Sequence, residues 1–294
     1  MEKRRVETVI ISDVHLGTYG CRAKELLKYL RSVETQHLIL NGDIVDMWQF
    51  RKRYWPNSHM QVIKHIVDLI NTGTRIDYIT GNHDEMLRKF TGFKMGSFQI
   101  TNKLLLNLNG KKTWIFHGDV FDVTMKHSKW LCTLGAIGYD TLILINGMIN
   151  RLLELFGRER ISLSKKVKNS IKSAVKFIDD FENTAAEIGV ANNYHNVVCG
   201  HIHQPQDVIK HTKKGPIRYL NSGDWIENLT ALEYNNSTWS LYKFDEDEAL
   251  KNAEPELENE TELNTSFLFE KLLAEMSIAQ PKHLDDLYPV ASAE

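Results

Sequence analysis

The chain has 294 residues, of which 42% are hydrophobic and 25% are charged, close to the average of globular proteins. Its 36 basic and 38 acidic residues nearly cancel, so the overall charge gives no reason to expect a nucleic-acid partner. The three cysteines form no CxxC pair, which argues against a disulfide framework or a cysteine-zinc site. The sequence lacks a signal peptide and any clean apolar run of about 20 residues, so we expect a cytoplasmic protein without a transmembrane helix.

The first third of the chain alternates predicted strands with predicted helices. Val6 to Ile11 is apolar and β-branched, which is typical of a buried strand. Helical spacing follows from Arg22 to Arg31, and a second strand is predicted at His37 to Leu40. A helix is predicted from Met60 to Asn71, and a third strand from Arg75 to Thr80.

Later segments predict more strands. Asn109-Gly110 is a strong hairpin signal between the strands Leu104 to Leu108 and Lys112 to Phe116. Four further strands are predicted at Val197 to Cys199, Ile217 to Leu220, Leu229 to Tyr234 and Thr238 to Phe244. This pattern predicts an α/β (α+β) fold, either one mixed sheet layered with helices or two sheets packed as a sandwich.

The composition also divides the chain into regions. Residues 1–120 and 194–244 carry the strand pattern and are expected to form the main domain. Residues 121–193 have helical patterning without a clear strand, and we expect an inserted helical cap. Residues 245–294 begin with an acidic stretch and are expected to be a partly disordered tail.

Five apolar strands end in short clusters of Asp, His and Asn: SDVHLG, NGDIVD, GNHDE, FHGD and GHIHQP. Ligands in open α/β sheets bind beyond the carboxyl ends of the strands, so we expect these side chains to meet at one edge of one sheet. Asp13 and His15 are two residues apart, which on continuing strand geometry points both to one face. His201 and His203 repeat this spacing.

These clusters offer oxygen and nitrogen ligands without a thiolate, which suits Mn, Fe, Zn or Mg. A single histidine on a strand is more often structural, but the clusters together supply more ligands than one open ion needs. They suit two ions that share a bridging carboxylate. The predicted ligands are Asp13, His15, Asp43, Asn82, His117, His201 and His203.

The ordered set D-x-H, GDxxD, GNHD, HGD and GHxH resembles the calcineurin-like metallophosphoesterase family over roughly residues 8 to 235. The resemblance implies a two-sheet sandwich flanked by helices, with the predicted helical cap inserted. It also implies one ion held by Asp13, His15, Asp43 and His203. A second ion would be held by Asp43, Asn82, His117 and His201, so that Asp43 bridges the two.

The resemblance further implies a hydrolase in which a hydroxide between the ions attacks phosphorus. His83 would act at the leaving oxygen as a proton donor or charge stabiliser. Asp46 would orient His83 by a hydrogen bond, and the alternative for Asp46 is a helix N-cap.

Within the family, the chain is most similar to the UDP-2,3-diacylglucosamine pyrophosphatase branch. The shared features are SDVHLG, NGDIVDMWQF, the helical insertion, and the segment Asn221 to Trp225. This similarity implies hydrolysis of the diphosphate of a lipid-linked nucleotide in lipid A synthesis, with Mn as the usual ion. The best-known members of the branch have Arg where this chain keeps His83 of the wider family. The alternative is therefore a soluble enzyme acting on a nucleotide, phosphodiester or phosphoprotein.

The insertion bears on the substrate. Leu131 to Ile149 is apolar but interrupted by Asp140 and Asn146, which fits an acyl-binding or membrane-facing cap and equally fits packing against the main domain. We therefore expect a small-molecule or lipid-linked nucleotide substrate and peripheral contact with the cell membrane. Several cations are candidates for phosphate contacts, or else lie on solvated faces: Arg51, Arg53, Arg88, Arg158, Lys165 and Lys168.

Overall fold

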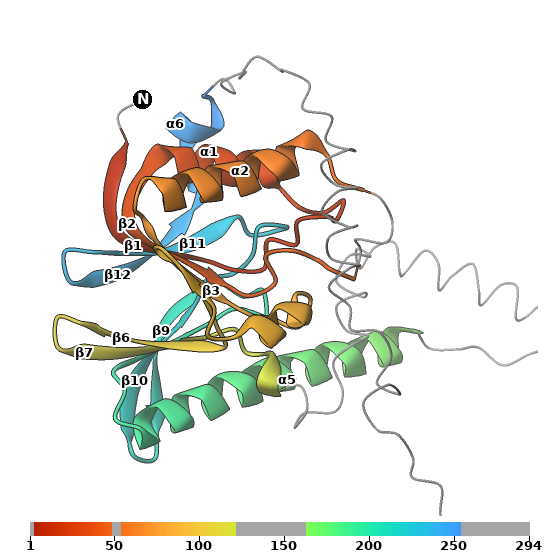
Figure 1. The fold of residues 1–294 in the computed structure, drawn as a ribbon. Coiled ribbons are helices and arrows are strands. Elements are labelled where there is room, and N and C mark those ends of the chain that lie inside the picture. The colour runs from red at the N-terminus through yellow and green to blue at the C-terminus, as the bar shows by residue number, and fades with distance from the viewer. Residues whose placement is uncertain (1–2, 49–53, 122–162, 254–294) are drawn as a thin grey trace, which may run out of the picture. The chain divides into compact units, whose positions relative to one another are not determined.

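The computed structural model describes residues 3–48, 54–121 and 163–253, with side chains from residue 175 onward in the last range (Figure 1). The described residues up to Lys251 belong to one compact unit, and the fold described below is that unit. The second unit, Asn252–Glu294, lies almost entirely outside the described residues. The predicted apolar stretch from Leu131 to Ile149 also lies outside them.

The first sheet has the strand order β12-β11-β1-β2-β3-β5-β4. Its strands are β1 (Arg4–Ile11), β2 (Val33–Asn41), β3 (Arg75–Ile79), β4 (Lys94–Met95), β5 (Phe98–Thr101), β11 (Thr230–Asn235) and β12 (Thr238–Lys243). β1, β2 and β3 are parallel neighbours, so their carboxyl ends share one edge.

The second sheet has the order β6-β7-β8-β10-β9. Its strands are β6 (Lys103–Leu108), β7 (Lys111–Phe116), β8 (Asn196–Cys199), β9 (Gln206–Thr212) and β10 (Gly215–Asn221). β6 and β7 form the predicted hairpin, which turns at Asn109-Gly110, where both residues have the positive φ that a tight hairpin requires. β7 and β8 are parallel.

Two sheets packed face to face, with helices outside them, make the predicted sandwich (Figure 1). Ile10 and Ile39 of the first sheet, which are fully buried, pack with the fully buried Val198 of the second in one apolar cluster. The helices of this unit are α1 (Ala23–Ser32), α2 (Asn57–Asn71), α5 (Leu163–Ala191) and α6 (Glu248–Lys251), with 3-10 turns η2 (Glu85–Phe90), η3 (Asp119–Phe121) and η4 (Phe244–Glu246). Leu26 of α1 and Val62 of α2 are buried in the cluster that covers the outer face of the first sheet.

α5 covers the outer face of the second sheet. Phe181, Ala185 and Ala186 of this helix are buried in one cluster with residues of β8 and β10. The predicted cap, residues 121–193, therefore extends too far, because the second half of α5 is part of the main unit. In the described residues, no helix is both long enough and apolar enough to cross a membrane.

Two other expectations need correction. The tail was expected to begin at residue 245, but η4 and α6 continue the main unit, and Leu250 is 4% exposed. The strand β9 was not predicted, because its sequence QDVIKHT is polar and lies at the edge of its sheet, where one side of the strand faces solvent.

Candidate metal centre

The motif residues all follow strand ends, but the strands belong to two sheets. Asp13 and His15 follow β1, and Asp43 follows β2 in the first sheet. His117 follows β7, and the segment with His201 follows β8 in the second sheet. The expectation of one edge of one sheet is therefore wrong: the predicted ligands gather where the carboxyl ends of two facing sheets meet.

Backbone amides tie the motif loops to one another. The N–H of His15 donates to the carbonyl oxygen of Asp43 at 2.9 Å, and the N–H of His83 donates to Oδ1 of Asp43 at 2.8 Å. Across the sheets, the N–H of His201 donates to Oδ2 of Asp13 at 3.0 Å. The position of each loop thus depends on its neighbour, and the two aspartates are acceptors at the centre of the arrangement.

The backbone here is left-handed rather than extended. Five of the seven predicted ligands have positive φ: Asp13 52°, His15 53°, Asp43 54°, His201 68° and His203 52°. Non-glycine residues rarely adopt this region, and such conformations concentrate at functional sites. The expected continuing strand geometry from Asp13 to His15 is wrong, because β1 ends at Ile11 and the chain turns at each ligand.

Two motif glycines leave room for ligand side chains. A Cβ on Gly42 would overlap the ring of His117, and a Cβ on Gly81 would overlap the carboxylate of Asp43. Gly42 also has a φ of +81°. A larger residue at either position would displace the ligand side chain that it overlaps, so the glycines allow close packing of ligands from different loops.

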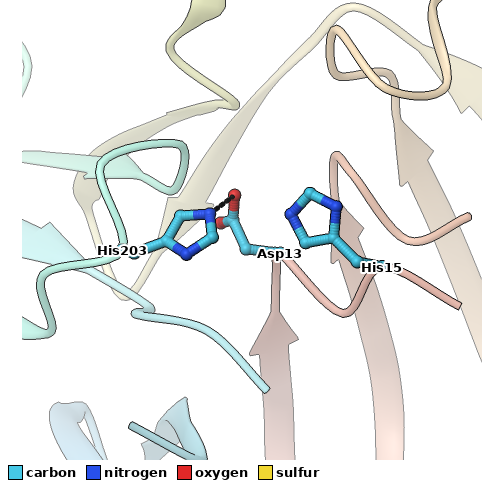
Figure 2. A group of neighbouring side chains, drawn as sticks. All are labelled: Asp13, His15 and His203. Carbon is cyan, nitrogen blue, oxygen red and sulfur yellow. Dashed lines mark ion pairs between the residues drawn. The ribbon is translucent and has the colours of Figure 1, made fainter. Parts of the chain in front are cut away.

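The side chains form adjoining groups whose ligand atoms lie within 4.8 Å of one another. Figure 2 shows the first group, in which the Asp13 carboxylate lies between the rings of His203 and His15. Asp13 Oδ1 is 3.2 Å from Nε2 of His203. The other groups are His15 with Asp43 and His83, and Asp43 with His117 and His201, so Asp43 belongs to two of the three.

Several predicted ligand atoms are buried without a hydrogen-bond partner in the described part of the chain. They include Nε2 of His15, Oδ1 of Asn82 and Nε2 of His117. Nε2 of His117 lies 3.2 Å from Oδ2 of Asp43, but not in hydrogen-bonding geometry. Nδ1 of His117 is 2.9 Å from the carbonyl oxygen of Asn41, which assigns the ring proton to Nδ1 and leaves the Nε2 lone pair for a cation. Buried polar atoms without partners are rare, and this donor set fits divalent metal ions.

Charge is concentrated in this cluster. Burial favours the protonated form of Asp13, but the His203 and His117 rings outweigh burial and lower the pKa of Asp13 to about 2. Burial likewise opposes charging of His203, yet Asp13 raises the pKa of His203 to about 9. Against burial, Asp43 and Asp13 raise the pKa of His117 well above its ordinary value. The protons on these rings occupy positions that a cation would take, so metal binding would release them.

His83 stands beside the predicted ligands with Asp46 behind it. Nδ1 of His83 is 3.0 Å from Oδ2 of Asp46, and the His83 ring lies 4.6 Å from the ring of His15. Burial lowers the pKa of His83, but the Asp46 hydrogen bond and the Asp43 charge together raise it by more than burial lowers it. The pKa of His83 is therefore shifted upward. No helix begins at Asp46 in the residues described, and its carboxylate contacts His83 as the orienting interpretation requires.

The segment from Asp224 to Asn228 contacts the backbone of His203, which belongs to the first ligand group. Asp224 is fully buried, and its Oδ1 accepts the backbone N–H groups of Ile226 and Glu227 at 2.8 and 2.6 Å. The amide of Asn228 bridges Oδ2 of Asp224 and the backbone carbonyl of His203, at 2.5 and 2.9 Å. Sequence reasoning gave these two residues no role, although they follow β10 as the other polar clusters follow their strands.

The predicted phosphate-binding cations are less informative. Arg88 donates to the carboxylate of Asp119 and to the carbonyl of Gly81, so it ties η2 to η3. Lys165 and Lys168 lie on α5, but their side chains are not among those described. Arg51, Arg53 and Arg158 lie outside the described residues.

Comparisons with known proteins agree with the geometry. Residues 7–205 match the family model for calcineurin-like phosphoesterases. A UDP-2,3-diacylglucosamine hydrolase of Aliivibrio fischeri (strain MJ11) is 22% identical over 250 residues, covering 80% of this chain and 97% of that protein. The protein of the same name from Salmonella agona (strain SL483) is 28% identical over 211 residues, covering 67% of this chain and 82% of its own.

Solved structures were also matched. A predicted phosphoesterase from Streptococcus pneumoniae TIGR4 is 15% identical with a TM-score of 0.34, covering 82% of this chain and 90% of that one. An archaeal phosphodiesterase is 12% identical with a TM-score of 0.38, covering 80% and 98%. The family match spans more than half of the chain and includes all the motif loops up to His203. The chain therefore belongs to the calcineurin-like phosphoesterase family and is a metal-dependent hydrolase.

Proposed function

We propose that this hydrolase cleaves the diphosphate of UDP-2,3-diacylglucosamine, or of a related lipid-linked nucleotide, with two divalent ions of which Mn is the first candidate. The observation that carries the two-ion part is the position of Asp43, which shares one ligand group with His15 and another with His117. The substrate part rests on relatives named UDP-2,3-diacylglucosamine hydrolase that match over 80% and 67% of the chain.

The proposed ligands divide around Asp43. One ion would be held by Asp13, His15, His203 and Asp43, and the other by Asn82, His117, His201 and Asp43. When bound, such ions neutralise phosphate charge and lower the pKa of a water molecule so that it becomes a nucleophile at neutral pH. The buried ligand atoms without partners, Nε2 of His15 and Oδ1 of Asn82, support this assignment.

His83 is the proposed proton donor to the leaving phosphate oxygen. The hydrogen bond to Asp46 engages Nδ1 and leaves Nε2 of the same ring for the substrate. Asp46 also favours the charged ring, because a carboxylate acceptor stabilises imidazolium. Asp46 would therefore act through His83 as a positioning residue, with His83 as the group that touches the substrate.

The test is a direct assay of the full chain. Protein loaded with Mn is incubated with UDP-2,3-diacylglucosamine in mixed micelles, and UMP release is measured with and without EDTA. We expect release that EDTA abolishes and Mn restores. His83→Gln should lower kcat with little change in Mn content, because His83 is not a proposed ligand. Absence of UMP release by metal-loaded protein would remove the lipid-linked substrate.

A second candidate is a soluble phosphodiester or nucleotide substrate. It is favoured by His83, which keeps the histidine of the wider family and has Asp46 in hydrogen-bonding contact. The matching assay uses bis(p-nitrophenyl) phosphate and small nucleotides without detergent. Turnover of a small nucleotide far above that of the lipid-linked nucleotide would favour this candidate, and the metal site would be the same.

A further inference from the structure

The segment Lys89–Gly96 is exposed along its whole length, although it carries large apolar side chains. Phe90 is 54% exposed, Phe93 47% and Met95 58%. This docking segment starts at the end of η2, which itself follows Asn82, His83 and Asp84 of the metal centre directly. Clustered exposed apolar residues are a cost in water and mark surfaces that meet a partner.

The backbone holds these side chains outward. The N–H of Phe93 donates to the carbonyl of Phe90 at 2.9 Å, and the N–H of Ile100 donates to the carbonyl of Phe93 at 3.0 Å. Met95 lies on β4, which pairs antiparallel with β5 at the edge of the first sheet. The exposure of the rings is therefore part of the folded structure, and not the fraying of a chain end.

After Glu85, the sequence that contains the docking segment carries charges of one sign over 33 residues. From Met86 to Gly118 the sequence has no Asp or Glu. The same stretch contains six cations: Arg88, Lys89, Lys94, Lys103, Lys111 and Lys112. Arg88 is paired with Asp119, whereas Lys89 and Lys94 have no carboxylate partner within the described ranges. An apolar surface with unpaired cations is complementary to a surface that is apolar inside and anionic outside.

We propose that the docking segment binds the surface of an anionic lipid bilayer. Phe90, Phe93 and Met95 enter the boundary between headgroups and acyl chains, while Lys89 and Lys94 contact lipid phosphates. Docking through this segment would hold the loop of Asn82 and His83 close to the bilayer. The inference deepens the proposed function, since a lipid-linked substrate lies in such a bilayer, but its test requires no catalysis.

The test measures co-sedimentation of the full-length protein with two kinds of vesicle. One contains phosphatidylcholine alone, and the other also contains about 30% phosphatidylglycerol as the anionic lipid. We expect the wild type to bind the anionic vesicles. The double variant Phe90→Ser/Phe93→Ser should reduce the partition coefficient at least about tenfold. Full binding by this variant, or no binding of the wild type, would overturn the proposal.

A charge variant and a matched apolar control separate the two contributions. Lys89→Gln/Lys94→Gln should weaken binding to anionic vesicles up to about 25-fold, at roughly fivefold per lysine, and leave binding to neutral vesicles unchanged. Val208→Ser/Ile209→Ser changes two exposed apolar residues of β9, which are 39% and 56% exposed, and should leave binding unchanged. Equal losses in both apolar variants would show non-specific adsorption and contradict the proposal.

The alternative to a lipid surface is that the docking segment binds a second copy of the chain. Sedimentation velocity without lipid tests it, and Phe90→Ser/Phe93→Ser should not change the sedimentation coefficient. A shift from dimer to monomer with unchanged vesicle binding would overturn the proposal. Hydrolysis of bis(p-nitrophenyl) phosphate by the same variants reports on the metal centre. Vesicle binding through the segment without UMP release would leave this inference standing while the proposed substrate fails.

Discussion

Two buried histidine–aspartate pairs in this unit lie in different surroundings. His37 of β2 and Asp77 of β3 approach to 2.5 Å within the first sheet. His117 and Asp43 approach to 3.2 Å beyond the strand ends, where the two sheets meet. Both carboxylates are buried, at 0% exposure for Asp77 and 2% for Asp43.

The pair within the sheet makes a direct hydrogen bond through Oδ2 of Asp77, although Oδ1 of Asp77 is buried without a partner in the described part of the chain. Arg75 adds a contact to Asp77 at 2.9 Å, and the His37 hydrogen bond overcomes burial to lower the pKa of Asp77. At the metal centre, Asp43 has a left-handed φ of 54° and Nε2 of His117 has no hydrogen-bond partner among the residues described. A buried pair alone is therefore no sign of a metal site. Backbone strain and unpaired ligand atoms, converging from several loops, distinguish it.

The largest effect is expected at the carboxylate that both ligand groups share. Asp43→Asn removes the charge that would bridge two ions, so we expect kcat/KM to fall on the order of a thousandfold, or about 4 kcal/mol in the barrier. Bound Mn, measured by atomic absorption after gel filtration, should fall below one ion per chain. A variant that keeps two ions and near-normal activity would refute the bridging role.

Substitution in the pair within the sheet should lower the free energy of unfolding and leave metal binding unchanged. Asp77→Ala leaves the buried His37 ring without its hydrogen-bond acceptor and the half-exposed Arg75 without its carboxylate, so we expect a loss of about 1 to 3 kcal/mol in the free energy of unfolding. Urea denaturation at pH 7 measures this loss. Mn content and kcat of the folded fraction should match the wild type, and a selective loss of metal would place Asp77 in the site after all.

The sequence predicted the features of the fold and of the metal centre that depend on local residue pattern. The apolar runs located β1, β2 and β3, and the polar clusters after them located Asp13, Asp43 and Asn82. It did not predict that the clusters lie on two sheets, because strand pairing is non-local and the run at β7 reads the same in either sheet. The left-handed turns at the ligands were missed for a similar reason: hydrogen bonds between loops hold them, and Asp and His adopt this region only occasionally.

The supporting residues were the hardest to predict. Asp224 and Asn228 lie more than 20 residues beyond His203, and contacts between loops bring them behind it. Their role can be tested with a change that keeps the local turn. Asp224→Asn retains an oxygen for the N–H groups of Ile226 and Glu227 but removes the charge near His203, whose Nδ1 lies 3.9 Å from Oδ2 of Asp224.

We expect Asp224→Asn to weaken binding of one of the two ions about ten- to a hundredfold, as changes behind metal ligands generally do. Isothermal titration with Mn into metal-free protein resolves the two affinities. Unfolding of the metal-free variant in urea should show a loss of about 1 to 3 kcal/mol, since the turn is kept but the hydrogen bond from Asn228 to Oδ2 is lost. Asp207→Asn is a matched control, because it removes a carboxylate whose hydrogen bonds go to Arg218 rather than to a proposed ligand. Equal weakening in both variants would argue against a specific role for Asp224.

The last prediction concerns a third kind of buried histidine, one without a carboxylate partner among the described residues. His59 of α2 is 2% exposed, and its Nδ1 accepts the N–H of Gly17, two residues after the proposed ligand His15, at 2.9 Å. Burial lowers the pKa of His59 from 6.5 to about 4. The unfolded chain therefore takes up this proton near pH 6.5, whereas the folded chain takes it up near pH 4. The contribution to stability is present above pH 6.5 and is lost as the pH falls toward 4.

His59→Asn isolates this contribution, since the amide oxygen can still accept from Gly17 but does not titrate. In metal-free protein, the wild type should lose about 2 kcal/mol relative to the variant between pH 7 and pH 5. Urea unfolding of both proteins across that range gives the difference directly, and the titration of all other groups cancels in it. At pH 7 the variant should be the less stable protein, because it leaves a small cavity beside Trp55. A difference that stays constant with pH would mean that His59 is protonated as easily in the folded chain as in the unfolded one.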